Sequence, residues 1–250
     1  MRLKNYFNFK TKNMLSIIIP TLNEEEYLPL ILKEIKKQKF TEVEVIVADA
    51  GSKDKTIEIA KNYGCKITSG GLPAVGRNKG AKQAKGDMFL FMDSDNISLP
   101  KNFLAELIKE FKERNLDVAS FPICVQGNSF DKFSYDAYNL FVKSTQKFIA
   151  HTFNSVLVKR EVFEKINGFD ETVKLGEDQD FGKRASKISR FGFIETEPVL
   201  TSARRLEKDG RFKTYLKYLL TGVHLVFLGP VKSDIFKYRF GYPSRGKGLR

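Results

Sequence analysis

Short apolar runs recur along the chain and predict a set of buried strands. The runs at 15–20 and 88–93 are apolar almost throughout, and further strands are expected at 42–49, 65–69 and 118–123. Runs that are continuously apolar, rather than alternating, are typical of strands buried on both faces of a sheet. We therefore expect five strands, with those at 15–20 and 88–93 buried on both faces.

Amphipathic segments between these runs predict helices. The expected boundaries are Asn23 and Ser52 as helix caps, Gly64 and Gly86 as helix ends, a third helix over 75–85, and Pro100 at the opening of a fourth helix. Acidic residues follow Asn23 directly, where the helix dipole favours them. The alternation of strands and helices predicts an α/β fold, with a mainly parallel central sheet flanked by helices.

The composition supports a folded core and excludes several classes of protein. Hydrophobic residues make up 42% of the chain and aromatic residues 12%, so disorder is not the expected state. Two cysteines, Cys65 and Cys124, are too few for a disulfide framework, and two histidines exclude a His-rich metal site. The first 13 residues lack the apolar stretch of a signal peptide, so no targeting signal is expected.

The net charge of +13 is carried by the two ends of the chain. Residues 1–13 hold four basic residues and no acid, residues 203–250 hold twelve basic and three acidic residues, and 14–202 holds 27 of each sign. A neutral middle argues against a nucleic-acid-binding core, so no nucleic-acid partner is expected. Basic ends suit an anionic surface, and we expect a membrane surface as a partner of the C-terminal tail.

Polar side chains follow three of the predicted strands at their carboxyl ends, where parallel sheets bind ligands. Thr21 and Glu24 follow the first strand, Asp49 the second, and Asp93 and Asp95 the fourth. Asp93 and Asp95 flank one serine, so an extended backbone places both carboxylates on one side of the chain. Such oxygen ligands suit Mg²⁺ or Mn²⁺ shared with the phosphates of a substrate. Turn formation and helix capping are the structural alternative for the Asp, Asn and Ser residues at these strand ends, among them Asn23, Ser52 and Asp54.

Five motifs follow one another along the chain: PTLNE (20–24), ADAGSKDKT (48–56), GRNKGAKQAKGD (76–87), FMDSD (91–95) and GEDQD (176–180). In order and spacing this series resembles the family 2 glycosyltransferases, which are inverting enzymes with the A-type nucleotide-sugar-binding fold. The resemblance covers roughly residues 14–205. It implies a Rossmann-like nucleotide-binding half, a nucleotide-sugar donor, and Mg²⁺ or Mn²⁺ as cofactor.

The resemblance also implies roles for individual residues. These are donor binding for Pro20, Thr21, Glu24, Asp49, Arg77, Asp93, Arg204 and Arg205, metal binding for Asp95 and Asp93, general base catalysis for Asp178, and an acceptor-side position for Glu177. The residue types suit these roles, because a guanidinium matches phosphate oxygens and a carboxylate can take a proton from an acceptor hydroxyl.

Each implied role has a structural alternative. For Arg77 with Lys79, and for Arg204 with Arg205, the alternative is a solvated charged surface. Glu177 and Asp178 are alternatively ordinary acids of a first helical turn, and Asp180 is a rival for the base. His151 could cover the active site, with a structural hydrogen-bonding role as the alternative. The chain also departs from the family pattern. Ala50 follows Asp49 where a second acid is common, and Leu22 stands where an aromatic residue is common.

The last part of the chain is predicted to be an amphipathic, basic helical tail. Its stripe at helical spacing is Phe212, Leu216, Leu219, Val223 and Val226, widened by Tyr215, Leu220 and Phe227. We expect this helix either to pack on the domain or to lie in a bilayer surface, because no segment has the roughly 20 apolar residues of a spanning helix. The expected units are a basic extension at 1–13, with Met14 as an alternative start, a catalytic domain at 14–205, and the tail at 206–250.

The sequence therefore predicts an enzyme: a glycosyltransferase that moves a sugar, with inversion, from a nucleotide-sugar to a hydroxyl of a glycan or lipid-linked acceptor. We expect it in the cytoplasm, at the cytoplasmic face of a membrane. Three alternatives stay open. A nucleotidyltransferase of related architecture would release pyrophosphate, a non-catalytic nucleotide- or carbohydrate-binding module would bind without turnover, and a nucleic-acid binder is suggested by the basic ends alone.

Overall fold

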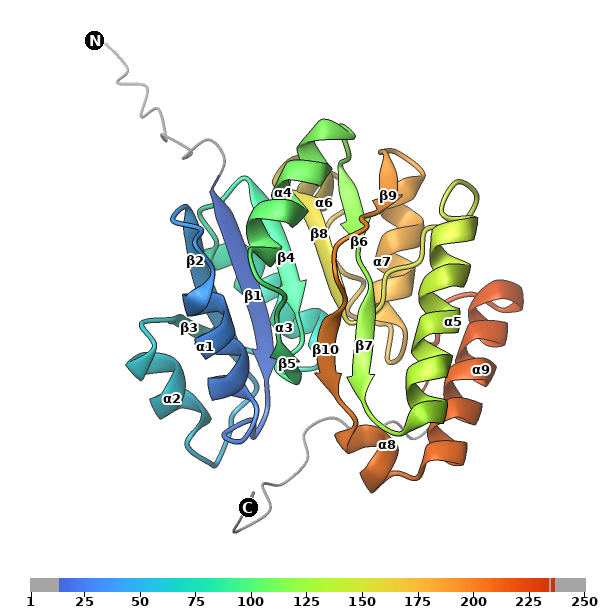
Figure 1. The fold of residues 1–250 in the computed structure, drawn as a ribbon, viewed down its shortest axis with the longest axis horizontal. Coiled ribbons are helices and arrows are strands. Elements are labelled where there is room, and N and C mark those ends of the chain that lie inside the picture. Colours follow the sequence, from blue (N-terminus) through green and yellow to red (C-terminus); the bar gives the residue numbers. More distant parts are fainter. Residues whose placement is uncertain (1–13, 234, 237–250) are drawn as a thin grey trace.

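The computed structural model describes residues 14–233, 235 and 236, without the side chain of Val226. The predictions made for 1–13, for the basic end of the chain after residue 236 and for Val226 lie outside the described residues. In the described part, helices cover both faces of a large sheet (Figure 1).

A seven-stranded sheet runs through the middle of the structure in the order β3-β2-β1-β4-β8-β6-β9. Its strands are β1 (Leu15–Thr21), β2 (Val43–Asp49), β3 (Lys66–Ser69), β4 (Met88–Met92), β6 (Val118–Ser120), β8 (Ser155–Lys159) and β9 (Phe191–Phe193). β8 is antiparallel to its neighbours β4 and β6, and the other pairs are parallel. The prediction of a mainly parallel sheet is confirmed.

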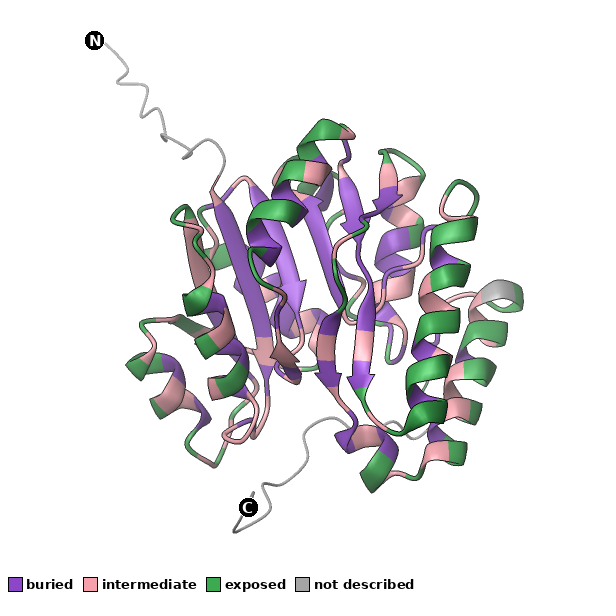
Figure 2. Cartoon of the chain, in the orientation of Figure 1, coloured by how far each residue is buried: buried purple, intermediate pink, exposed green. Residues whose placement is uncertain are grey.

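Side chains of the strands alternate between two hydrophobic cores, one on each face of the sheet. Ile17 and Ile19 belong to the core covered by α1 (Leu28–Lys37), α2 (Thr56–Asn62) and α4 (Phe103–Glu113), whereas Ile18 belongs to the core covered by α3 (Pro73–Gln83), α6 (Arg160–Lys165) and α7 (Glu177–Ser186). Figure 2 shows the central strands as largely buried. Burial on both faces explains why the runs at 15–20 and 88–93 are apolar almost throughout.

A small second sheet and two long helices extend the fold. The sheet has the order β5-β10-β7 and consists of β5 (Asn96–Ser98), β7 (Ile123–Gln126) and β10 (Val199–Ser202). α5 (Ser129–Thr145) begins with a capping box between Asn128 and Asp131 and packs on β7. α8 (Arg204–Lys208) and α9 (Arg211–Phe227) follow β10, and α9 lies beside α5 at one end of the molecule (Figure 1).

The loop after β1 differs from the prediction, because Asn23 caps no helix. Asn23 has a left-handed backbone, with φ of 55°, and its N–H donates to Ser52 Oγ at 2.8 Å. α1 begins only at Leu28. Ser52 caps no helix either, since its hydroxyl donates to Asp49, and α2 begins at Thr56. Both predicted caps were wrong, because these side chains join the two loops to each other.

Other boundaries also shift. The run predicted as one strand at 118–123 divides at Pro122 into β6 and β7, which belong to different sheets, because proline has no N–H for a strand ladder. α4 begins at Phe103 rather than at Pro100, and α3 is displaced by two residues from the predicted 75–85. Gly64 follows α2 with φ of 78°, as predicted for a helix end.

The described part of the C-terminal tail packs on the domain. Leu206 lies in the hydrophobic core, Val231 pairs with Leu175, and Thr214 and Thr221 of α9 are buried. The boundary expected after residue 205 falls inside α8. α9 nevertheless leaves apolar side chains exposed, and none of the described helices has the length and apolar character needed to cross a membrane.

Candidate active site

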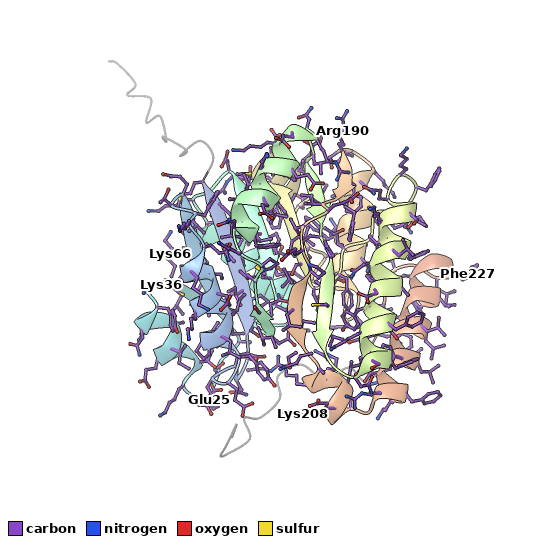
Figure 3. The ribbon with its side chains drawn as sticks, viewed as in Figure 1. Glu25, Lys36, Lys66, Arg190, Lys208 and Phe227 are labelled. Carbon is purple, nitrogen blue, oxygen red and sulfur yellow. The ribbon has the colours of Figure 1, made fainter. Side chains whose placement is uncertain are left out.

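The carboxyl ends of β1, β2 and β4 lie together at the lower edge of the sheet in Figure 1. Glu25, in the loop after β1, and Lys208, in α8, lie at this same edge in Figure 3. Because these strands are parallel neighbours, residues that are distant in sequence meet where the strands end.

Asp49 organises the loops after β1 and β2. Its Oδ2 accepts hydrogen bonds from the hydroxyl of Thr21, at 3.0 Å, and from that of Ser52. Its Oδ1 accepts the backbone N–H groups of Gly51 and Ser52, at 2.9 and 2.8 Å. These four donors satisfy the hydrogen-bonding capacity of the buried Asp49 carboxylate. Asp49 therefore stabilises the turn after β2, which is the structural role considered as an alternative to ligand binding.

Arg204 joins the loop after β1 to the end of β4. Its two terminal nitrogens each donate to the carboxylate of Glu24 at 2.7 Å, and its Nε donates to Asp95 Oδ2 at 3.3 Å. The guanidinium also lies 4.6 Å from the centre of the Tyr27 ring. Burial raises the pKa of Glu24, although Arg204 opposes this. Arg204 and Glu24 are both buried, so the alternative of a solvated charge run is wrong for Arg204.

Arg77 joins the end of β4 to the start of α7. It donates to Glu177 Oε1 at 2.5 Å and to Asp93 Oδ1 at 2.8 Å. Burial alone would lower the pKa of Arg77, but the charges of Asp93 and Glu177 raise it, so the guanidinium stays ionised. Arg77 is 3% exposed, which excludes the alternative of a solvated helix face. Two buried arginines thus each bridge two carboxylates.

Asp178 lies in the first turn of α7, next to this network. The backbone N–H of Asn154 donates to its Oδ2 at 3.0 Å, and the hydroxyl of Thr152 donates to its carbonyl. Burial raises the pKa of Asp178 to about 7, the charge of Glu177 adds to the rise, and Arg77 opposes it. A carboxyl group that ionises near neutral pH is suited to take a proton from a substrate.

Asp180, the rival for the base, has a different environment. Its Oδ2 accepts from Arg184 Nε at 2.7 Å, and Arg184 also donates to the carbonyl of Ile166. This half-buried ion pair anchors α7 to the end of α6, so the Asp180 carboxylate is used in packing. The contacts of Asp180 therefore favour Asp178 over Asp180 as the candidate general base.

The site contains more acid than base. Glu24, Asp93, Asp95, Glu177 and Asp178 surround the two arginines, and burial raises the pKa of Asp93 to about 6, with Asp95 and Glu177 adding to the rise. Carboxylates held this close favour a bound cation. Among the described residues no three His, Cys, Asp or Glu side chains are grouped so as to hold a metal ion. Asp93 and Asp95 supply carboxylate oxygens, which are the ligand type of a divalent cation that shares its remaining ligands with a substrate.

The other predicted residues lie around this network. Thr21 bonds to Asp49, Pro20 lies so close to Gly76 that a Cβ there would be 3.2 Å from that of the proline, and Arg205 is half-buried in α8. The ring of His151 lies 5.1 Å from that of Phe141, and burial lowers the pKa of His151.

Several contacts of the site were not predicted. Asn78 accepts the N–H of Phe169 and donates to its carbonyl, both at 2.9 Å, and so fixes the segment that leads to α7. Tyr138 of α5 accepts a hydrogen bond from Gln179, the neighbour of Asp178. These contacts join residues 91 and 41 positions apart, which no local pattern indicates. The position of Asn78 inside the GRNKG motif was the one available signal.

The comparison with known protein families supports the resemblance. Residues 16–168 match the family model described as Glycosyl transferase family 2. The chain belongs to this family.

Among curated family members, the poly(ribitol-phosphate) beta-N-acetylglucosaminyltransferase TarS of Staphylococcus aureus is 32% identical over 183 residues, which is 68% of this chain and 32% of TarS. Glycosyltransferase GlyG of Streptococcus pneumoniae is 27% identical over 238 residues, 90% of this chain and 70% of GlyG. The chain thus matches about a third of the length of TarS.

Solved structures of glycosyltransferases share the fold. TarS residues 1–349 in complex with UDP match with a TM-score of 0.62 and 24% identity, over 76% of this chain and 60% of that one. The mannosyltransferase PcManGT from Pyrobaculum calidifontis, in complex with GDP-Man and Mn²⁺, matches with a TM-score of 0.62 and 19% identity, over 84% of this chain and 65% of that one. At these identities the likeness establishes the A-type glycosyltransferase fold.

Proposed function

We propose that the protein is a glycosyltransferase that moves a sugar from a nucleoside-diphosphate sugar to the hydroxyl group of an acceptor, with inversion at the anomeric carbon. The observation that carries this proposal is the position of Asp178. Its carboxyl group has a pKa of about 7 and stands next to Glu177, which the buried Arg77 links to Asp93 at the end of β4.

The chemistry needs one base and one charged leaving group. In the proposed reaction Asp178 takes the proton of the acceptor hydroxyl as its oxygen forms a bond to the anomeric carbon. The bond between that carbon and the donor diphosphate breaks, and the nucleoside diphosphate leaves with the electron pair. A single displacement of this kind inverts the anomeric configuration, whereas retention by double displacement would need a nucleophile on the opposite face of the sugar.

The arginines are proposed to position the acids. Arg77 holds Asp93 and Glu177, and Arg204 holds Asp95. In the proposed site Asp93 and Asp95 would lie on the donor side and Glu177 on the acceptor side. Asp95 and Asp93 would hold Mg²⁺ or Mn²⁺, which when bound supplies positive charge to the oxygens of the departing diphosphate. We place Arg205 on the diphosphate side, since it follows Arg204 directly in α8.

The donor class is inferred from the relatives and from the fold. TarS has been solved with UDP and with UDP-GlcNAc, and PcManGT with GDP-Man and Mn²⁺. We propose a nucleoside-diphosphate sugar for this chain, with base and sugar to be found by screening. Pro20, Thr21, Glu24 and Asp49 form the corner where the nucleoside would lie, and Glu177 lies on the acceptor side. The acceptor is proposed to be a hydroxyl of a glycan or of a lipid-linked glycoconjugate.

The test is product analysis with a panel of donors. UDP-, GDP- and dTDP-sugars are incubated with the full chain and Mn²⁺, with a simple alcohol as acceptor, and the released phosphate species is identified. The proposal predicts release of a nucleoside diphosphate and an alkyl glycoside whose anomeric configuration, read by NMR, is opposite to that of the donor. Pyrophosphate release would identify a nucleotidyltransferase, and a retained configuration would contradict the single displacement. Donor binding without turnover would point to the non-catalytic module.

A further inference from the structure

Exposed hydrophobic side chains gather on α5 and α9. Eighteen large hydrophobic side chains are exposed among the described residues, and fourteen of them lie on these two helices or within eight residues after them. Phe133, Phe212 and Phe227 are 70%, 83% and 79% exposed. Concentrations of apolar surface on this scale mark interaction sites, whereas single exposed residues need no explanation.

The two helices form one surface. The rings of Phe130 and Tyr215 are 5.6 Å apart, and Arg211 Nε of α9 lies 2.9 Å from Asp131 Oδ2 of α5. Figure 1 shows the helices side by side at one end of the sheet, Figure 2 shows their outer sides exposed, and Figure 3 places Phe227 at the outermost edge. We name the exposed apolar side chains of 130–149 and 212–235 the α5–α9 face.

The charge around the α5–α9 face is positive. Residues 211–235 hold four Lys or Arg and one acid, Asp234, which lies outside the described residues, and residues 129–149 hold three Lys and two Asp. Asp131 is buried and paired with Arg211, so Asp136 is the one exposed acid among the described residues of these segments. Lys132, Lys147 and Lys213 are exposed among the aromatic side chains. An apolar surface rimmed by lysine matches the headgroup region of an anionic bilayer.

We infer that the α5–α9 face binds the surface of an anionic lipid bilayer, with both helices lying in the plane of the interface. A second copy of the chain fits this face less well, because a two-fold contact would bring its lysines against each other, and among the described residues of these segments Asp136 is the one exposed acid to offset them. Crossing the bilayer is not required, and no described helix has the length for it.

The α5–α9 face lies close to the first turn of α7. A Cβ on Gly176, the residue before Glu177, would lie 3.0 Å from Leu225 of α9, and Tyr138 of α5 accepts a hydrogen bond from Gln179. If the proposed function holds, a bilayer on this face brings membrane-embedded acceptors to the side of the molecule where Asp178 stands. That step rests on the proposed function, whereas bilayer binding itself does not.

The test is co-sedimentation of the full chain with vesicles of phosphatidylcholine, with and without phosphatidylglycerol. The triple variant Phe133→Ser/Leu219→Ser/Phe227→Ser removes exposed apolar groups, and the matched control Leu30→Ser/Ile67→Ser/Ile188→Ser removes others from elsewhere on the surface. We expect the triple variant to bind anionic vesicles at least tenfold more weakly than the wild type while keeping the wild-type Tm, and the control to bind as the wild type does. Lys132→Glu/Lys213→Glu is expected to weaken binding to anionic vesicles and to leave binding to neutral vesicles unchanged.

Three results would overturn the inference: a wild type that does not bind, a triple variant that binds as the wild type does, or a wild-type dimer that the triple variant converts to a monomer. Hydrolysis of the nucleotide-sugar by water is measured on the same proteins without vesicles. Vesicle binding without any hydrolysis would support the bilayer site and count against the proposed function. Hydrolysis without vesicle binding would support the proposed function and overturn the bilayer site.

Discussion

Replacing Arg204 by methionine tests how the site is held together. Glu24 is 5% exposed and receives two hydrogen bonds of 2.7 Å from Arg204, which is itself 8% exposed. Removing one partner of a buried ion pair leaves an uncompensated charge and costs about 3–5 kcal/mol of unfolding free energy. For a chain of this size about 1 kcal/mol shifts Tm by about 2–4 °C, so we expect Arg204→Met to lower Tm by about 6–20 °C.

The loss of stability is expected to depend on pH. Burial already raises the pKa of Glu24 with Arg204 present, and removing the arginine raises it further. A carboxyl whose pKa is higher in the folded state binds its proton more tightly there, so it stabilises the fold at low pH and loses this contribution as the pH rises through the folded-state pKa. The gap in stability between wild type and Arg204→Met should therefore be larger at pH 8 than at pH 5.

The assay is urea and thermal unfolding at both pH values, with two further variants. Lys37→Met removes an exposed ion pair with Glu34, in which the lysine side chain is 58% exposed, and should cost at most about 1 kcal/mol. The double variant Glu24→Leu/Arg204→Met removes both charges and should regain much of the stability lost by Arg204→Met. The reasoning is contradicted if Arg204→Met costs no more unfolding free energy than Lys37→Met. It is also contradicted if the loss of unfolding free energy in Arg204→Met is equal at both pH values.

Three further predictions concern the base, the fold and the cation. The pKa of Asp178 is about 7, and the base acts in its deprotonated form. We therefore expect kcat/KM to fall about tenfold per pH unit below pH 7 and to level off above it. A flat profile from pH 5 to 9 would count against Asp178 as the base. A Cβ on Gly80 would lie 2.4 Å from Ile18 Cγ2, so Gly80→Ala should destabilise the fold by about 1–3 kcal/mol in urea unfolding, whereas Gly222→Ala, which meets open space in α9, should stabilise it slightly. Asp93→Asn should lower the affinity for Mn²⁺ about tenfold, measured by titrating Mn²⁺ in the presence of nucleoside diphosphate and following the rise in Tm. An unchanged titration would remove Asp93 from the metal site.

The sheet could be predicted because burial on two faces leaves a simple pattern. Runs such as 15–20 and 88–93 are apolar almost throughout, and each forms a central strand. Helix starts were predicted less well, since an Asn or Ser after a strand can serve a neighbouring loop as readily as a cap. Asn23 and Ser52 bond to residues of the opposite loop or strand end, and local sequence carries no information about that partner.

The residues of the site could be named from the motifs, but their partners could not. Arg77 was expected at the donor phosphates, and the structure shows it between Asp93 and Glu177, which lies 100 positions away in sequence. The contact of Arg204 with Glu24 spans 180 positions. Contacts of this kind depend on the order of the strands in the sheet. The motifs indicate which residue types the site contains, but they do not indicate the strand order.

The most direct test of the central claim compares Asp178→Asn with Asp180→Asn. Both changes remove one carboxylate from the first turn of α7 and are nearly isosteric, so donor affinity, Tm and the rate of nucleoside diphosphate release are measured for each. The account predicts that Asp178→Asn slows release by about 10²–10⁴-fold while donor affinity stays within a few-fold, and that Asp180→Asn lowers Tm but keeps most of the rate. Release by Asp178→Asn within tenfold of the wild type, or an equal loss of rate in both variants, would contradict Asp178 as the base.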